Sequence, residues 1–280
     1  MLRRILIPLD PSPFAQAALD WGCYAAKITS AELTGLAVLD QPGIERSIGS
    51  IPAGGIHYAQ HLIEKKEKDA LEYIEKLLKN FEDKCKQEGV AYRLAERQGN
   101  PSDQIIRDSI FYDLVVIGLR TYYQFDDDAK QGESVVEVLN QSVTPVLAVP
   151  DRFVSPERRK IKALVAFDGS LPSVRSIHRF AQLVRTAEFS VTILMSHPDM
   201  DYAKGCLSQA EAFMRAHDFK DIKTVWTPQN IIEEIREEYL EQTNLLVLGA
   251  HSKRGITNFM VGSLSKSLIK MENKYILIGQ

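Results

Sequence analysis

Short apolar runs alternate along the chain with longer segments in which apolar residues recur every three or four positions. The short runs predict buried strands, and the three-to-four spacing predicts amphipathic helices. The clearest helix is expected over residues 58–88, where apolar positions are interleaved with lysine and glutamate and Gly89 follows as a terminator. Strands that alternate with helices in this way predict a parallel, doubly wound sheet of the α/β class.

The expected elements come in the same order in both halves of the chain. Strands of the first half are expected over residues 5–9, 33–39, 91–96, 114–117 and 145–149. Its helices are expected from Pro13 onward and over residues 58–88, 102–111 and 133–141, with an exposed Gly/Pro/Ser-rich loop over residues 41–56. The second half predicts strands over 162–167, 189–195, 221–226, 244–248 and 274–278, and helices over 171–187, 199–217, 229–242 and 263–271.

A strand-end signature that occurs twice indicates a tandem duplication. An apolar run ends in Asp10, a turn residue and Ser12, and a second run ends in the same way at Asp168 and Ser170. We therefore expect one domain over residues 1–150 and another over 159–280, joined by a charged linker. Because parallel α/β sheets bind ligands at the carboxyl ends of their strands, both aspartates occupy candidate ligand positions.

Composition narrows the possible functions. The chain has 280 residues with a net charge of −3, which argues against a general nucleic-acid binder. Its three cysteines show no metal-binding spacing and fit a reducing compartment. We find neither a signal peptide nor an apolar run long enough to span a membrane, so a cytoplasmic protein without membrane or nucleic-acid partners is expected.

The loop after the fourth strand of the second half has features that suit an anion. Glycines let the backbone N–H groups approach a ligand, and Gly262-Ser263 stands at the start of an expected helix, where phosphate is favoured. Lys253 and Arg254 add positive charge. The alternative is that these glycines only turn the chain and the cations only contact solvent. The loop does not contain a Walker A sequence.

Together, the strand-one aspartate, this loop and the repeated element order resemble two universal stress protein domains in tandem. The nucleotide-binding members of that family carry Gly-x-x-Gly, nine residues and then Gly-Ser/Thr after strand four. Gly249, Gly262 and Ser263 match that pattern here, whereas Ser252 stands at the second glycine, where its hydroxyl could hydrogen-bond a ligand oxygen. The resemblance implies Rossmann-like domains, of the adenine nucleotide alpha hydrolase type, with five parallel strands each in the order 3-2-1-4-5. It also implies a site for ATP or a related adenine nucleotide, with or without magnesium, at Asp168, Gly249, Ser252, Lys253, Gly262 and Ser263.

The corresponding loop of the first half departs further from the family pattern. It begins with Gly118, has Thr121 at the second glycine and Glu133 at the Ser/Thr position, and carries an acidic run over residues 126–128. The three aspartates and the glutamate of this loop would repel a triphosphate. The acidic run could hold Mg²⁺, although a solvated loop is favoured. We expect the site of this half to have lost the ability to bind ATP. The possibility that it binds a different small ligand stays open.

The leading hypothesis is a stress-response regulatory protein that binds an adenine nucleotide mainly in its C-terminal half. The alternatives are an interaction module with vestigial sites and a slow ATPase. No nucleophile motif is present, so we expect no catalytic residues, and His57 and His61 are expected to be solvent-exposed rather than metal ligands. The two fifth strands are expected to pair with each other, so that the two halves form an intramolecular pseudo-dimer. An unknown protein partner is also expected, and the possibility of a homodimer stays open.

Overall fold

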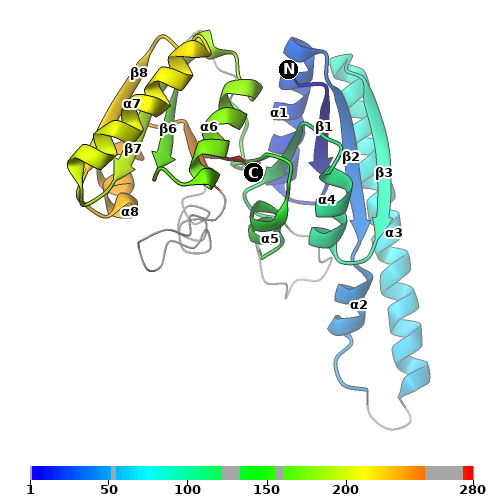
Figure 1. The fold of residues 1–280 in the computed structure, drawn as a ribbon. Coiled ribbons are helices and arrows are strands. Elements are labelled where there is room, and N and C mark those ends of the chain that lie inside the picture. The colour runs from blue at the N-terminus through cyan, green and yellow to red at the C-terminus, as the bar shows by residue number, and fades with distance from the viewer. Residues whose placement is uncertain (1, 52–54, 122–132, 155–159, 250–273, 280) are drawn as a thin grey trace. The chain divides into compact units, whose positions relative to one another are not determined.

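The computed structural model describes residues 2–51, 55–121, 133–154, 160–249 and 274–279 (Figure 1). These residues divide into two compact units. The N-terminal unit comprises Leu2–Gln141 and Asp151–Phe153, and the C-terminal unit comprises Ser142–Pro150 and Val154–Gln280. The helix expected over residues 263–271 lies outside the described residues.

The N-terminal unit contains a parallel sheet in the order β3-β2-β1-β4. These strands are β1 (Arg4–Pro8), β2 (Glu32–Leu39), β3 (Tyr92–Gln98) and β4 (Leu114–Gly118). The helices of this unit are α1 (Pro13–Thr29), α2 (Gln41–Ser47), α3 (Ile56–Glu88), α4 (Pro101–Ser109) and α5 (Glu133–Gln141). The strand order is the one expected for the first four strands of this half.

The C-terminal unit contains strands in the order β5-β10-β9-β6-β7-β8. All neighbours are parallel except β5 and β10, which are antiparallel. Its strands are β5 (Val146–Val149), β6 (Ile161–Phe167), β7 (Phe189–Ser196), β8 (Ile222–Thr227), β9 (Leu245–Gly249) and β10 (Tyr275–Gly279). Its helices are α6 (Leu171–Leu183), α7 (Met200–Ala216) and α8 (Ile231–Glu234), with a 3₁₀ turn at Thr186–Glu188 and a π-helical turn at Ile235–Tyr239.

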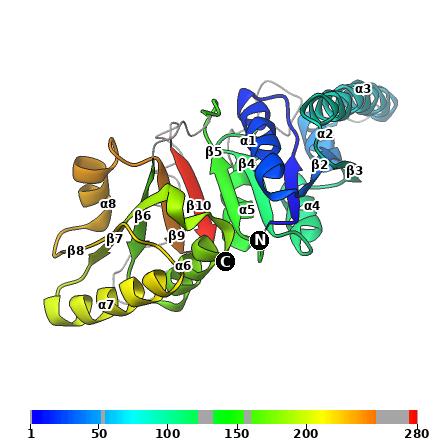
Figure 2. The same cartoon turned by 90° about the horizontal axis from the view of Figure 1, so that it is seen from above.

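The predicted α/β fold and the predicted pairing of the two fifth strands are confirmed. Strand β5 belongs to the first half of the sequence, yet it lies in the C-terminal unit, where Leu147 pairs with Leu277 (Figure 2). Both strands are buried along this contact. Pairing of the two strands satisfies backbone groups that an open strand edge would leave exposed.

The expected exposed loop over residues 41–56 is wrong in part, because residues 41–47 form α2. Asp40 caps this helix, since its Oδ1 accepts a hydrogen bond from the backbone N–H of Gly43 at 2.9 Å. Pro42 lies in the first turn, where its missing N–H costs nothing. Ile44 then packs into a cluster with Leu39 and Ile74. Gly and Pro suggested a loop here, whereas the cap and the buried isoleucine make a short helix.

Two helices of the C-terminal unit are shorter than the sequence predicted. Helix α6 ends at Leu183, before the expected residue 187, and the 3₁₀ turn follows it. The helix expected over residues 229–242 is α8 and its π-helical turn, which together end at Tyr239. Helix ends are set by local hydrogen bonding as much as by apolar spacing, so periodicity places them only within a few residues.

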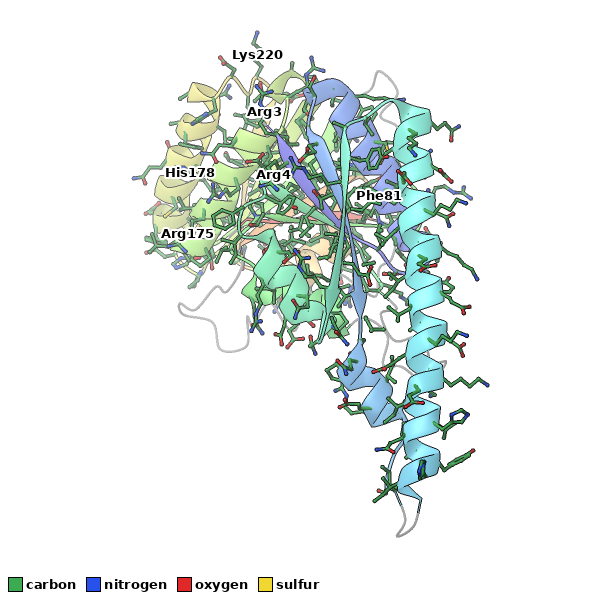
Figure 3. The ribbon with its side chains drawn as sticks, turned by 90° about the vertical axis from the view of Figure 1, so that its right-hand side faces the viewer. Arg3, Arg4, Phe81, Arg175, His178 and Lys220 are labelled. Atoms are coloured by element: carbon green, nitrogen blue, oxygen red, sulfur yellow. The ribbon has the colours of Figure 1, made fainter. Side chains whose placement is uncertain are left out.

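The long helix α3 lies against β2 through one apolar face. Phe81 is 1 % exposed and points from α3 toward the strands (Figure 3). It lies directly over Gly35 of β2, where an added Cβ would come within 2.8 Å of the Phe81 ring. Gly89 ends the helix as predicted, at a φ of 66° that suits glycine. The opposite face carries the expected charged residues.

Candidate functional site

The Asp-x-Ser signature forms the same turn in both units. Oδ1 of Asp10 accepts a hydrogen bond from the Ser12 backbone N–H at 2.7 Å, and Ser12 Oγ accepts from the Ala15 N–H at 3.1 Å. In the C-terminal unit, Asp168 Oδ1 accepts from the Ser170 N–H at 2.9 Å, and Ser170 caps α6. One carboxylate oxygen therefore shapes a turn that leads into a helix cap. The same local hydrogen-bond pattern therefore follows the first strand of each half, as the repeated signature predicted.

The two aspartates differ in their accessibility. Asp10 follows β1 and is 4 % exposed, and it lies beside the buried cap residue Ser12. Asp168 follows β6 and is only partly buried, so it is the more exposed of the two aspartates. Both occupy the predicted carboxyl edge of a parallel sheet. Only Asp168 combines that position with an accessible side chain.

The glycines that end the fourth strands are required by helix packing. A Cβ at Gly249 would lie 2.6 Å from the backbone N of Ser173 and 2.7 Å from the backbone C of Pro172. A Cβ at Gly118 would lie 2.5 Å from the Cβ of Phe14 in α1. In both units, the helix after the first strand therefore rests directly on this glycine. That contact is sufficient to explain both residues without a ligand.

Aromatic side chains that the sequence analysis did not select lie near Gly169, the residue after Asp168. The next residue, Gly169, has a φ of 75°, and an added Cβ there would lie 3.3 Å from the Tyr202 hydroxyl oxygen. The Tyr202 ring lies 4.6 Å from the His197 ring, measured between centroids, and Tyr202 is 49 % exposed. Trp226 Nε1 donates to the His197 carbonyl oxygen at 2.9 Å. An aromatic residue soon after a strand end is the signal that could have identified this group.

The phosphate-binding part of the predicted site stays a prediction. Ser252, Lys253, Gly262 and Ser263 lie outside the described residues, as does the acidic run of the first half over residues 126–128. The structure therefore places Asp168 and Gly249 at the carboxyl ends of two paired strands and Tyr202 near Gly169, and it leaves the loop unassigned. In the N-terminal unit, Thr121 is 4 % exposed, and its Oγ1 has no hydrogen-bond partner among the described residues.

The predicted exposure of the two histidines of α3 is confirmed. His57 and His61 are both exposed on that helix. Within the described ranges, no group of three or more His, Cys, Asp or Glu side chains could hold a metal ion. The same part of the chain contains no helix that is long and apolar enough to cross a membrane.

The buried cap of α2 makes stability depend on pH. Asp40 is 3 % exposed, and burial raises its pKa, while the Gly43 N–H and Arg46 oppose that rise. A raised native pKa means that the folded chain holds the proton more tightly, so stability falls as pH rises from about 4 through the native pKa. Asp40→Asn keeps a cap acceptor and removes this titration. We therefore expect the free energy of unfolding of the variant, measured in urea, to rise relative to that of the wild type as the pH increases from 4 to neutral. A constant or falling difference would contradict this.

Comparisons with known proteins identify the family. A model of the universal stress protein family matches residues 1–150. Universal stress protein Sll1654 of Synechocystis sp. PCC 6803 is 30 % identical over 152 residues, or 54 % of this chain and 87 % of that protein. The chain therefore belongs to the universal stress protein family.

Solved structures extend the likeness to nearly the whole chain. A universal stress protein from Archaeoglobus fulgidus aligns over 99 % of this chain and 96 % of its own, with a TM-score of 0.73 and 17 % identity. A protein of unknown function from Pseudomonas aeruginosa PAO1 aligns over 99 % and 92 %, with a TM-score of 0.55 and 16 % identity. These likenesses show a shared fold.

Proposed function

We propose that this protein is a stress-response regulator that binds an adenine nucleotide at the carboxyl edge of its C-terminal sheet. The observation that carries the proposal is the contrast between the two strand-one aspartates. Asp168 is partly exposed and precedes Gly169, which lies close to the Tyr202 hydroxyl, whereas Asp10 is buried. Membership of the universal stress protein family supports a regulatory role in stress.

Each part of the proposed site has a chemical role. The Asp168 carboxylate would accept hydrogen bonds from the adenosine moiety, and Tyr202 with His197 offers an aromatic surface on which a base can stack. The phosphates would extend past Gly249 toward Lys253, Gly262 and Ser263. Ser252 would hydrogen-bond a ribose or phosphate oxygen through its hydroxyl.

Calorimetric titration of the whole chain with ATP tests this assignment. Asp168→Asn keeps an acceptor for the Ser170 N–H, so the turn survives while the negative charge is lost. We expect affinity to fall about tenfold or more, since hydrogen bonds to a charged group contribute about 1.5–3 kcal/mol. The matched control is Asp10→Asn, which should leave affinity unchanged. Loss of binding in the Asp10 variant alone would overturn the assignment, as would undiminished binding in the Asp168 variant.

The aromatic surface provides a second, independent test. Tyr202→Ala removes the exposed ring beside Gly169, so we expect weaker binding of ATP and of adenosine alike. A Lys253→Ala variant should weaken ATP binding more than adenosine binding, because only ATP carries the phosphates. An equal effect of both variants on both ligands would contradict these roles.

An interaction module without a nucleotide is the second candidate, and one observation favours it. Ile56 and Tyr58, in the first turn of α3, are 63 % and 70 % exposed. Exposed apolar side chains of this kind occur at contact surfaces. Titration of the wild-type chain with ATP separates the candidates, because a pure interaction module would give no saturable heat.

We also propose that the protein is not an efficient enzyme. Fast phosphoryl transfer needs a bound metal and a residue that orients the attacking water, and the loop over residues 249–263 offers no carboxylate for either task. Backbone donors and cations bind the ground state as well as the transition state, which does not raise turnover. We expect a steady-state ATPase rate well below about 1 s⁻¹. A rate of that size that is lost in Lys253→Ala would refute the proposal.

A further inference from the structure

Two cysteines of the N-terminal unit meet between helices that are distant in sequence. Cys23 belongs to α1 and is 2 % exposed, and Cys85 belongs to α3 and is fully buried. The two thiols are hydrogen-bonded to each other. The third cysteine, Cys206, lies in the C-terminal unit and is only partly buried.

Ion pairs hold the two helices together on both sides of the cysteine pair. The Nζ of Lys84 lies 3.0 Å from an Asp20 carboxylate oxygen and 3.0 Å from a Glu88 carboxylate oxygen. Lys27 also pairs with Glu88. Asp20 and Lys27 are about one helical turn before and after Cys23, so the ion pairs fix α1 and α3 at the level of the thiols.

The two thiols are electrostatically unequal. The hydrogen bond from Cys85 and the nearby Lys84 ammonium lower the pKa of Cys23, although burial and Glu88 oppose this. The same hydrogen bond and burial raise the pKa of Cys85. Cys23 is therefore the thiol that more readily becomes a thiolate, and Cys85 is its proton-bearing neighbour. A nucleophilic thiolate beside a second thiol is the arrangement that forms a disulfide.

We propose that Cys23 and Cys85 are a redox modification site that closes to an intramolecular disulfide when a hydroperoxide oxidises it. The Cys23 thiolate attacks one peroxide oxygen, the O–O bond breaks, and Cys23 becomes a sulfenic acid while the hydroxide that leaves takes up a proton. The Cys85 sulfur then attacks the Cys23 sulfur, the S–O bond breaks, and hydroxide leaves with the Cys85 proton as water. With hydrogen peroxide, two thiols and one peroxide give one disulfide and two waters.

The bridge would link α1 covalently to α3. It closes a loop of about sixty residues, which restricts the unfolded chain and raises the stability of the folded one. Burial limits access to small oxidants, so hydrogen peroxide should react where bulky alkylating reagents do not. This selectivity distinguishes the pair from Cys206, which is more accessible and has no second thiol beside it within the described chain.

The experiment treats the full-length Cys206→Ser variant with hydrogen peroxide, unfolds it, alkylates it and maps its peptides by mass spectrometry. We expect one species in which peptides containing Cys23 and Cys85 are joined, with the loss of two hydrogen atoms and no alkylation. Reduction with a thiol should restore two alkylated cysteines. The oxidised chain should also melt at a higher temperature than the reduced chain.

Two further variants separate the roles of the cysteines. In the Cys206→Ser background, Cys85→Ser should stop at a sulfenic acid on Cys23 that dimedone traps once the treated chain is unfolded, whereas Cys23→Ser should give neither a bridge nor a trapped adduct. Cys→Ala versions repeat the comparison if a serine variant fails to fold. Thiols that both remain alkylatable after peroxide treatment would overturn the proposal. So would oxidation of Cys23 beyond the sulfenic acid without a bridge.

Discussion

Gly249→Ala is expected to destabilise the C-terminal unit by about 3 kcal/mol, at the upper end of the usual cost of overpacking. The new methyl group would lie within 2.8 Å of three backbone atoms of Pro172 and Ser173. Backbone at the start of a helix cannot rotate aside as a long side chain can, so α6 or β9 must shift. Urea unfolding followed by hydrogen-exchange mass spectrometry of peptides from α6 and β9 would measure the loss.

A glycine elsewhere in the same unit supplies the matched control. Gly205 lies inside α7, and an added Cβ there would have no heavy atom within 4 Å. Gly205→Ala should therefore stabilise the protein by up to about 1 kcal/mol, because alanine favours a helix over glycine. Equal effects of the two substitutions would show that Gly249 is not held by packing. A loss of nucleotide affinity in a stable Gly249→Ala protein would instead assign that glycine to the ligand.

Phe81→Ala should cost the N-terminal unit about 4 kcal/mol, the usual range for removal of a buried aromatic ring. The ring is 1 % exposed, lies over Gly35 of β2, and packs edge-on against Tyr92 of β3 at a centroid distance of 6.4 Å. Because Gly35 has no side chain, nothing on β2 can fill the space that the ring leaves. Hydrogen exchange in peptides of β2 and β3 should rise sharply.

The control for Phe81 lies on the same helix. Leu71 of α3 is 41 % exposed, so Leu71→Ala removes little buried surface and should change stability by less than about 1 kcal/mol. Both substitutions introduce alanine into the same helix, and they differ in how far the original side chain is buried. A large loss in the Leu71 variant would show that this exposed flank of α3 is covered in solution.

The sequence was sufficient to predict the order of the strands and the duplicated turn. Both depend on local patterns: apolar runs for strands, three-to-four spacing for helices, and Asp-x-Ser at two strand ends. The helix that begins at Pro13 behind the cap Ser12 was predicted from its own few residues, and the structure has that cap. Such features are encoded within one turn of chain, so a single sequence contains them.

Features that depend on distant residues were beyond the sequence. Nothing near Asp10 or Asp168 indicates that one carboxylate is buried and the other accessible, because exposure is set by the elements packed around each. Gly249 was selected as a ligand position, yet its closest neighbours are Pro172 and Ser173, more than seventy residues earlier. Tyr202 was missed for the same reason, since its position beside Gly169 appears only once α7 is placed. The phosphate loop stays a prediction.

The placement of β5 has a consequence for how the chain is made. Strand β5 leaves the ribosome early, but its partner β10 is synthesised about 130 residues later, near the end of the chain. At translation rates of about 5–20 residues per second, β5 waits for roughly ten seconds with that apolar edge unpaired. During this interval, the nascent chain exposes a strand edge that another nascent copy could occupy. Pairing with another nascent chain would then compete with the native pairing until β10 emerges, and a holding chaperone would have its greatest benefit during that interval.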